Sequence, residues 1–167
     1  MITNGVLDIV ELWKSTVERL NQQNSCSCCW EFYAPLTEVK LNIVRNKGNC
    51  CTHVFLLRNK PNDFTSALTY NNGYLNTEVN TENYDVLFLI SSKTGLNNYN
   101  ELAHHPIEES RYATIFKPLR ECIKSDIITA LCEHAQVTSW SGRYVYDYQD
   151  ENYYGLRISI SQRYERH

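Results

Sequence analysis

The sequence predicts a single α+β domain: an antiparallel or mixed sheet packed by an N-terminal helix and one long second helix, ending in a β-hairpin. Three observations predict it. Apolar residues recur at helical spacing near the N-terminus and again over residues 108–134, and segments of two-residue period lie between and after them. The chain has 167 residues, 43% hydrophobic and 21% charged, so we expect one domain over residues 1–167.

The first helix is expected over residues 5–21, where apolar side chains recur at spacings of three, four and seven. Thr3 or Asn4 can cap its first turn. In the second helix Pro118 removes one backbone hydrogen bond, so we expect either a kink or a start close to Arg111.

Residues 39–43 alternate between apolar and polar side chains, as expected for a half-buried strand. Residues 46–49, NKGN, are of types that favour turns, so residues 54–57 are predicted to be the return strand of a hairpin. Pro35 is expected to interrupt the preceding segment, residues 30–33.

Residues 84–91, YDVLFLIS, are almost continuously apolar, which predicts a central strand covered on both faces. Residues 144–148 and 156–161 alternate on either side of a predicted turn and indicate a C-terminal hairpin. Two long polar loops are expected, at about 58–83 and 92–107. The first, about 26 residues, is too long for an ordinary connection, so it should be functional or mobile.

The charge balance argues against nucleic acid as the primary ligand, because 16 Lys and Arg face 19 Asp and Glu for a net charge of −3. No apolar run approaches the roughly 20 residues that cross a bilayer, and the N-terminus lacks a basic segment followed by an apolar one. We therefore expect a soluble, non-secreted protein without a membrane partner. Seven cysteines without an export signal favour reduced thiols.

Two cysteine-containing segments admit a tetrahedral zinc site formed by Cys26, Cys29, Cys50 and His53. However, neighbouring residues on a strand point to opposite faces, so we favour structural cysteines and expect no metal or other cofactor. The zinc ligands leave open a second hypothesis, a small cytosolic zinc- or thiol-dependent regulatory or binding domain.

No nucleotide-binding, metalloprotease or nucleophile-elbow motif occurs, so we expect no enzyme activity. The remaining features are surfaces: an edge strand near the C-terminus, a long loop and many tyrosines. These residue types suit association between protein chains, although alternate tyrosines could equally face a core and solvent.

Several segments of the sequence resemble a known protein family. With the N-terminal amphipathic helix, the segments YDVLFLIS, RYATIFKPLRECI and YVYDYQDENYYGLRISISQRYE resemble the tail-terminator and head-to-tail connector proteins of tailed bacteriophages. The abundance of Asn and Tyr is similar to that in phages of Bacteroidetes hosts, including the crAss-like group.

The resemblance implies a tail-terminator-like α+β subunit that forms a homo-oligomeric ring in the virion, at the neck or tail end, after assembly in the host cytoplasm. Neighbouring portal, connector or tail proteins would be its partners, and DNA would pass through the ring without specific recognition. A ring requires two different contact patches per subunit. The resemblance directs attention to residues of the long loop and the terminal hairpin: Phe64, Tyr70, Tyr74, Tyr144, Tyr146, Arg157 and Arg163.

Overall fold

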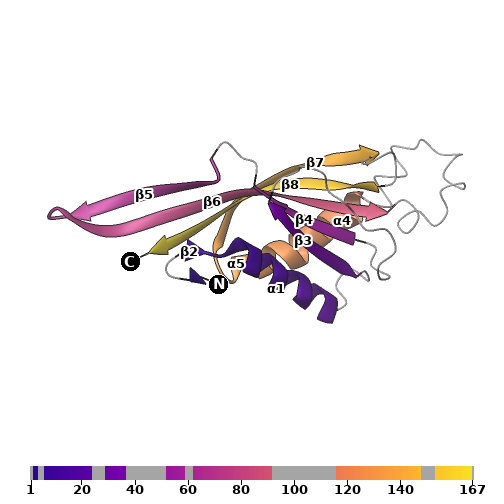
Figure 1. The fold of residues 1–167 in the computed structure, drawn as a ribbon, viewed down its shortest axis with the longest axis horizontal. Coiled ribbons are helices and arrows are strands. Elements are labelled where there is room, and N and C mark those ends of the chain that lie inside the picture. The colour runs from indigo at the N-terminus through magenta and orange to yellow at the C-terminus, as the bar shows by residue number, and fades with distance from the viewer. Residues whose placement is uncertain are drawn as a thin grey trace, which may run out of the picture.

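The structure is a computed structural model, and it describes residues 2–3, 6–23, 29–36, 52–58, 62–91, 116–147 and 153–166. These residues form a six-stranded sheet, a separate two-stranded ribbon and two helical segments, so the domain is of mixed α+β class as predicted (Figure 1). The elements are β1 (Ile2–Thr3), β2 (Val6–Leu7), α1 (Ile9–Gln22), β3 (Trp30–Leu36), β4 (Thr52–Leu57), β5 (Phe64–Asn71), β6 (Tyr74–Ser91), α4 (Lys117–Cys122), the π-helical stretch η4 (Ile123–Ile128), α5 (Thr129–Cys132), β7 (Gln136–Asp147) and β8 (Tyr153–Arg166).

The sheet is mixed. Its strand order is β3-β4-β6-β8-β7; β3 and β4 run parallel, and all other neighbours are antiparallel. The 18-residue β6 organises it. One edge of β6 pairs with β4 and, farther along, with β5, while β8 occupies the other edge. The N–H of Asn83 donates to the carbonyl of Asp63 at 2.8 Å, which continues this edge between β4 and β5.

The first helix begins later than predicted. Residues 2–3 and 6–7 form a short antiparallel ribbon, and α1 starts at Ile9. Its cap is Asp8, whose carboxylate accepts from the N–H of Glu11 at 3.1 Å, in place of Thr3 or Asn4. A carboxylate at this position also favours the positive end of the helix dipole.

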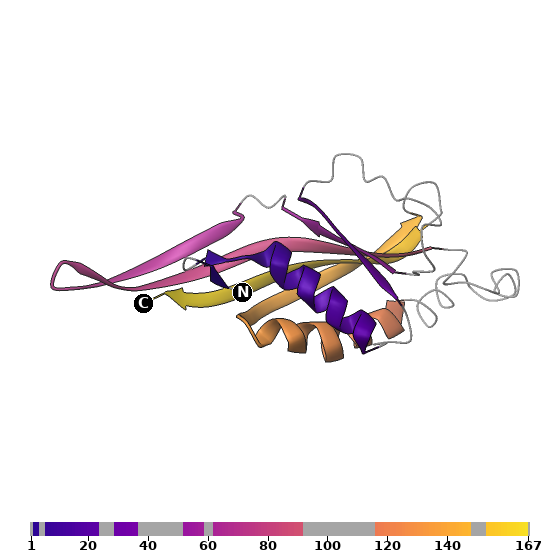
Figure 2. The same ribbon diagram turned by 60° about the horizontal axis from the view of Figure 1, so that its bottom comes forward.

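The second helical segment runs from Lys117 to Cys132, with Pro118 in its first turn, where a missing N–H breaks no helical bond. The prediction for residues 108–115, including a start near Arg111, lies outside the described residues. Both helical segments lie against the same face of the sheet (Figure 2). We call this the helix face.

The predicted central strand is confirmed, because residues 84–89 of β6 are all buried. Tyr84, Val86 and Phe88 join the main core beneath the helices, whereas Leu87 and Leu89 belong to a second buried cluster on the opposite face. The C-terminal hairpin is also confirmed, and its strands are longer than predicted. A predicted turn at residues 149–152 lies in a part of the chain that is not described.

A buried chain of hydrogen bonds ties the core together. The indole Nε1 of Trp13 donates to the Tyr84 hydroxyl at 3.0 Å, and that hydroxyl donates to Oε1 of Gln162. Gln162 Nε2 in turn donates to the carbonyls of Leu131 and Ala135. The side chains of Trp13, Tyr84 and Gln162 are fully buried, so these bonds join α1, β6, β8 and the end of α5 without solvent access.

Two sequence predictions about strands are wrong. Strand β4 is not the return strand of a hairpin with residues 39–43, because β3 and β6 occupy its two edges; residues 39–43 themselves are not described. Strand β3 continues through Pro35 to Leu36, with only a register shift after Tyr33. An outer strand tolerates proline because one of its sides needs no ladder hydrogen bond.

The predicted loop at 58–83 is also wrong. Residues 64–82 form an antiparallel hairpin from β5 and the first half of β6, closed by Asn72 and Gly73. Both turn residues have positive φ, 52° and 81°, as a two-residue type I′ turn requires. Figure 1 shows this hairpin projecting well beyond the helices, and we call residues 64–82 the arm. The second predicted loop, at 92–107, is outside the described ranges.

Candidate interaction surface

The arm carries most of the exposed large apolar side chains. Within the described part of the chain six such residues are exposed, and all but Val6 lie on the arm. The five are Phe64 (69% exposed), Leu68 (47%), Tyr70 (64%), Tyr74 (79%) and Leu75 (53%). A concentration of apolar side chains on one projecting element marks a contact surface, whereas scattered ones need no explanation.

Strand register assigns four of these residues to one face. Phe64 lies opposite Glu82 and Leu68 opposite Glu78, so both share the face of the even-numbered residues of β6. Tyr84, the next even-numbered residue, packs in the core beneath the helices. Beyond a register shift, Tyr70 pairs with Leu75 and extends the same row, while Tyr74 lies on the other face.

The apolar row of Phe64, Leu68, Tyr70 and Leu75 is therefore a continuation of the core-facing side of the sheet. It lies beyond the helices that cover the core in the body of the domain (Figures 1 and 2). A surface of core-like composition that no other described segment covers is suited to another protein.

The free edge of β5 is a second feature of the arm that suits contact with another chain. Every residue of β5 is exposed, and its sequence FTSALTYN has neither a charge nor a proline. By contrast, the other outer strands contain a proline or charged residues: Pro35 in β3, and Arg143 and Asp147 in β7. Charges and prolines discourage unwanted pairing at sheet edges, so among the described outer strands β5 is the least protected against pairing with another chain.

A hollow of about 520 Å³ lies on the helix face beside β7. It is lined by Lys117, Arg120, Glu121, Lys124 and Trp140. Trp140 lies opposite Ile160, a core residue, and is partly buried against the core. Three cations and one carboxylate around an indole ring suit an acidic or aromatic partner group.

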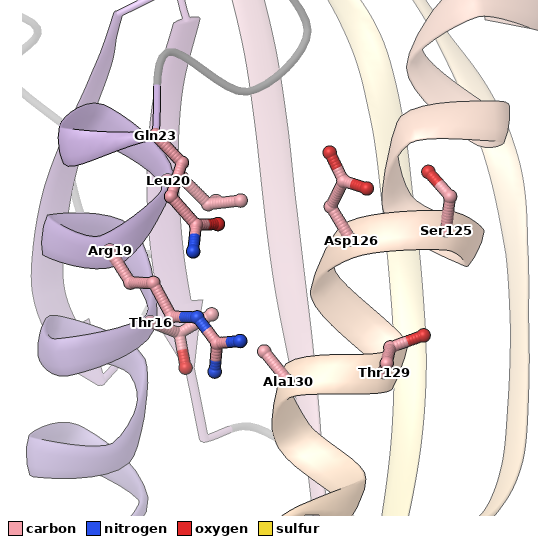
Figure 3. A pocket seen from close by; sticks show the side chains of 8 residues that line it. All are labelled: Thr16, Arg19, Leu20, Gln23, Ser125, Asp126, Thr129 and Ala130. Atoms are coloured by element: carbon pink, nitrogen blue, oxygen red, sulfur yellow. The ribbon is translucent and has the colours of Figure 1, made fainter.

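A second hollow lies between α1 and the segment formed by η4 and α5 (Figure 3). Arg19 from α1 and Asp126 from η4 lie on its opposite walls, and the Arg19 guanidinium donates to Glu133 at 2.7 Å. Its volume is about 160 Å³, which is below the size typical of small-molecule sites. This hollow therefore offers no strong ligand site.

The predicted contact residues of the terminal hairpin lie in different surroundings. Arg157 is 13% exposed, and its Nε donates to buried Asp85 at 2.9 Å, so its charge is used within the domain. Tyr144 stacks on Phe116 with 4.8 Å between ring centroids and accepts from Arg120 at 2.9 Å. Arg163 is 46% exposed beside Glu165. Tyr146 lies on β7, and its side chain is not described.

The predicted zinc ligands are only partly described, because Cys26 and Cys50 lie outside the described ranges. The carbonyl of Cys29 accepts from the N–H of Thr52 at 3.2 Å, so the starts of β3 and β4 are adjacent. His53 is buried on the face opposite the helices, near the rings of Tyr33 and Tyr153. Among the described residues no group of three metal-binding side chains occurs.

His53 lies in an environment that disfavours its charge. Burial lowers the pKa of the imidazole, and Glu31, whose carboxylate oxygen is 3.3 Å from Nδ1, partly opposes this effect. The same oxygen accepts from the Tyr33 hydroxyl at 2.6 Å, while Nδ1 of His53 lacks a well-aligned hydrogen bond. Neutral His53 therefore packs as part of an aromatic cluster.

The prediction of reduced thiols is wrong for Cys122 and the cysteine bonded to it. Cys122, buried on α4, is disulfide-bonded, whereas Cys132 at the end of α5 is a free, exposed thiol. An odd number of cysteines requires only one to be unpaired, and pairing of the others depends on three-dimensional proximity that spacing along the chain does not give.

The resemblance directed attention to Phe64, Tyr70 and Tyr74, whereas no pattern in the sequence singled out Leu68 and Leu75 of the arm or Trp140 of the larger hollow. Asn72-Gly73, preceded by the alternation FTSALTYN, was the available signal for a hairpin. For the hollow, no local signal existed, because α4 and β7 meet there only in three dimensions.

Comparisons with known proteins find no matching family model and no matching curated protein. Among the described residues, no helix is both long and apolar enough to span a membrane.

Proposed function

We propose that this protein is a structural subunit that acts by associating with copies of itself. In this proposal the copies form a ring at the neck or tail end of a tailed-phage particle, and DNA passes through the ring. The observation that carries the proposal is the uncovered apolar row of the arm, which continues the core side of the sheet.

Physical chemistry favours a contact at the arm. Strand β8 pairs with β6 only as far as Glu78, so the outer part of the arm is a two-stranded hairpin, which is only marginally stable in water. This outer part exposes apolar side chains on one face and an unprotected strand edge. Burial of the row against another chain would remove apolar surface from water and order the hairpin. A partner surface therefore stabilises the arm as well as the assembly.

The arrangement of surfaces suits a ring. The arm extends from one edge of the sheet, while β7 forms the opposite edge. Two different patches per subunit give head-to-tail contacts, which close into rings when the rotation between subunits allows it. A contact of one patch with its own copy would instead stop at a dimer.

The phage setting rests on the resemblance of the sequence to tail-terminator and connector proteins, with portal, connector or tail proteins as neighbours. The charge of the arm is compatible with a DNA conduit. The arm contains two carboxylates, Glu78 and Glu82, and no basic residue, so it adds no affinity for the phosphate backbone of passing DNA.

Light scattering after size-exclusion chromatography tests the association, together with negative-stain images of the particles formed. The arm variant is Leu68→Asn with Tyr70→Ser, on the helix face of β5. Its matched control is Thr65→Asn with Thr69→Ser, which introduces the same residue types on the other face of the same strand.

We expect wild type and the control to form rings of several subunits, and the arm variant to remain monomeric with an unchanged circular dichroism spectrum. A wild-type chain that stays monomeric at high micromolar concentration, and is absent from purified virions, would refute the proposal. Equal assembly of the arm variant and its control would show that the row is not the contact.

A further inference from the structure

The arm has a definite charge as well as an apolar surface. Glu78 lies on its helix face directly opposite Leu68, and Glu82 lies opposite Phe64. Glu82 is already paired, because Arg58 Nη1 donates to its carboxylate at 2.7 Å. Glu78 is therefore the carboxylate that the arm presents beside its apolar row.

The hollow beside Trp140 has the complementary chemistry. Lys117, Arg120 and Lys124 project from one helical segment and are exposed, with Glu121 as the single carboxylate in the lining. Arg120 is held in place by its bond to the Tyr144 hydroxyl. A volume of about 520 Å³ is enough for a leucine or tyrosine side chain, and the indole offers an apolar wall.

We propose that the helix face of the arm of one copy docks in the hollow beside Trp140 of a second copy, with Leu68 and Tyr70 against the indole and Glu78 among the lysines. This inference rests on the proposed self-association and names the surface that receives the arm.

The geometry excludes the same contact within one chain. Strands β6 and β8 separate β5 from β7, so the arm and the hollow of one copy lie at opposite edges of its sheet. Both surfaces nevertheless belong to the helix face. Because two surfaces in contact must face each other, docking requires the second copy to be turned so that its helix face meets the helix face of the first copy's arm.

Charge favours this arrangement over a contact between two arms. Two arms packed face to face would bring Glu78 of both copies together, with Arg166 of β8 opposite it in register as the nearest basic position and Arg58 already paired with Glu82. The hollow supplies three cations at the corresponding place. Electrostatic complementarity of this kind fixes the partner and the register of a contact.

A mixing experiment tests the proposal, using the arm variant described above and a hollow variant, Lys117→Glu with Lys124→Glu. The matched control is Lys14→Glu with Arg143→Glu, which changes the net charge equally at exposed positions that do not line the hollow. All proteins are measured by native mass spectrometry and mass photometry, alone and as equimolar pairs.

We expect each of the two variants to be monomeric alone, with association weakened at least tenfold, and the control to assemble as wild type does. The arm variant keeps an intact hollow and the hollow variant keeps an intact arm. Their mixture should therefore form a one-to-one dimer that grows no further.

Four results would overturn the inference, and the last of them would also overturn the proposed function. Normal assembly of the hollow variant would show that the arm docks elsewhere, while leaving the proposed self-association in place. A mixture that stays monomeric would exclude the complementary pair of surfaces. Loss of assembly in the charge-matched control would show that net charge, and not the hollow, governs the effect. A monomeric wild-type chain would remove the proposed function itself.

Discussion

The buried hydrogen-bond chain through Tyr84 gives the sharpest test of the packing. Tyr84→Phe removes one hydroxyl from a site with no solvent access and leaves two partners, Trp13 Nε1–H and Gln162 Oε1, without their bond. Because burial raises the pKa of Tyr84, the hydroxyl remains protonated and able to donate well into the alkaline range.

The expected loss is large for so small a change in volume. Each unsatisfied buried group costs about 1–3 kcal/mol, so the free energy of unfolding should fall by about 2–6 kcal/mol. For a chain of this size that corresponds to a decrease in Tm of at least about 4 °C. Tyr74→Phe is the matched control, because Tyr74 is 79% exposed and its change should stay within about 0.5 kcal/mol.

Urea denaturation followed by tryptophan fluorescence and circular dichroism measures both variants. The double variant Tyr84→Phe with Gln162→Met removes two partners together, so its loss should be smaller than the sum of the two single losses by at least about 1 kcal/mol. Strict additivity, or a Tyr84→Phe loss no larger than that of Tyr74→Phe, would refute the assignment of these bonds.

Two further predictions concern His53 and the arm. Burial lowers the pKa of His53 below its ordinary 6.5 in the folded chain, so the unfolded chain binds the proton more readily and stability is lost as the pH falls below 6.5. His53→Gln should therefore show a shallower decline in unfolding free energy over that range by urea titration, and an unchanged decline would contradict the assignment. Gly73→Ala places a side chain at φ 81°, at a local cost of about 1–2 kcal/mol. Amide exchange of the arm should become faster while Tm changes little; a large fall in Tm would mean that the arm is part of the cooperative core.

Some features could be predicted because burial differs sharply between neighbouring positions. The apolar stripe of α1 and the continuous apolar run at 84–91 each encode an environment that only one type of element satisfies. The terminal hairpin followed from the same contrast at residues 156–161, where Leu156, Ile158 and Ile160 are buried.

The arm could not be recognised from burial contrast, because every residue of β5 and of the turn is exposed and Thr, Ser and Asn occupy many of its positions. A strand without a buried face has a weak pattern and a weakly specified register. The only remaining signal was the dipeptide Asn72-Gly73, which favours a two-residue hairpin turn. The long polar segment around it lacks sustained periodicity, and this led to the prediction of a loop.

The α+β class, the amphipathic first helix, the central strand and the C-terminal hairpin follow from the period of apolar residues along the chain, so they could be predicted without coordinates. Which residues share a surface depends on the three-dimensional packing. In the folded chain β4 pairs with β3 in parallel, and Gln162 is buried against Tyr84. Arg157 neutralises Asp85, and Trp140 lies beside the cations of α4 and η4. Such pairings join residues far apart in the chain, and local periodicity carries no information about them.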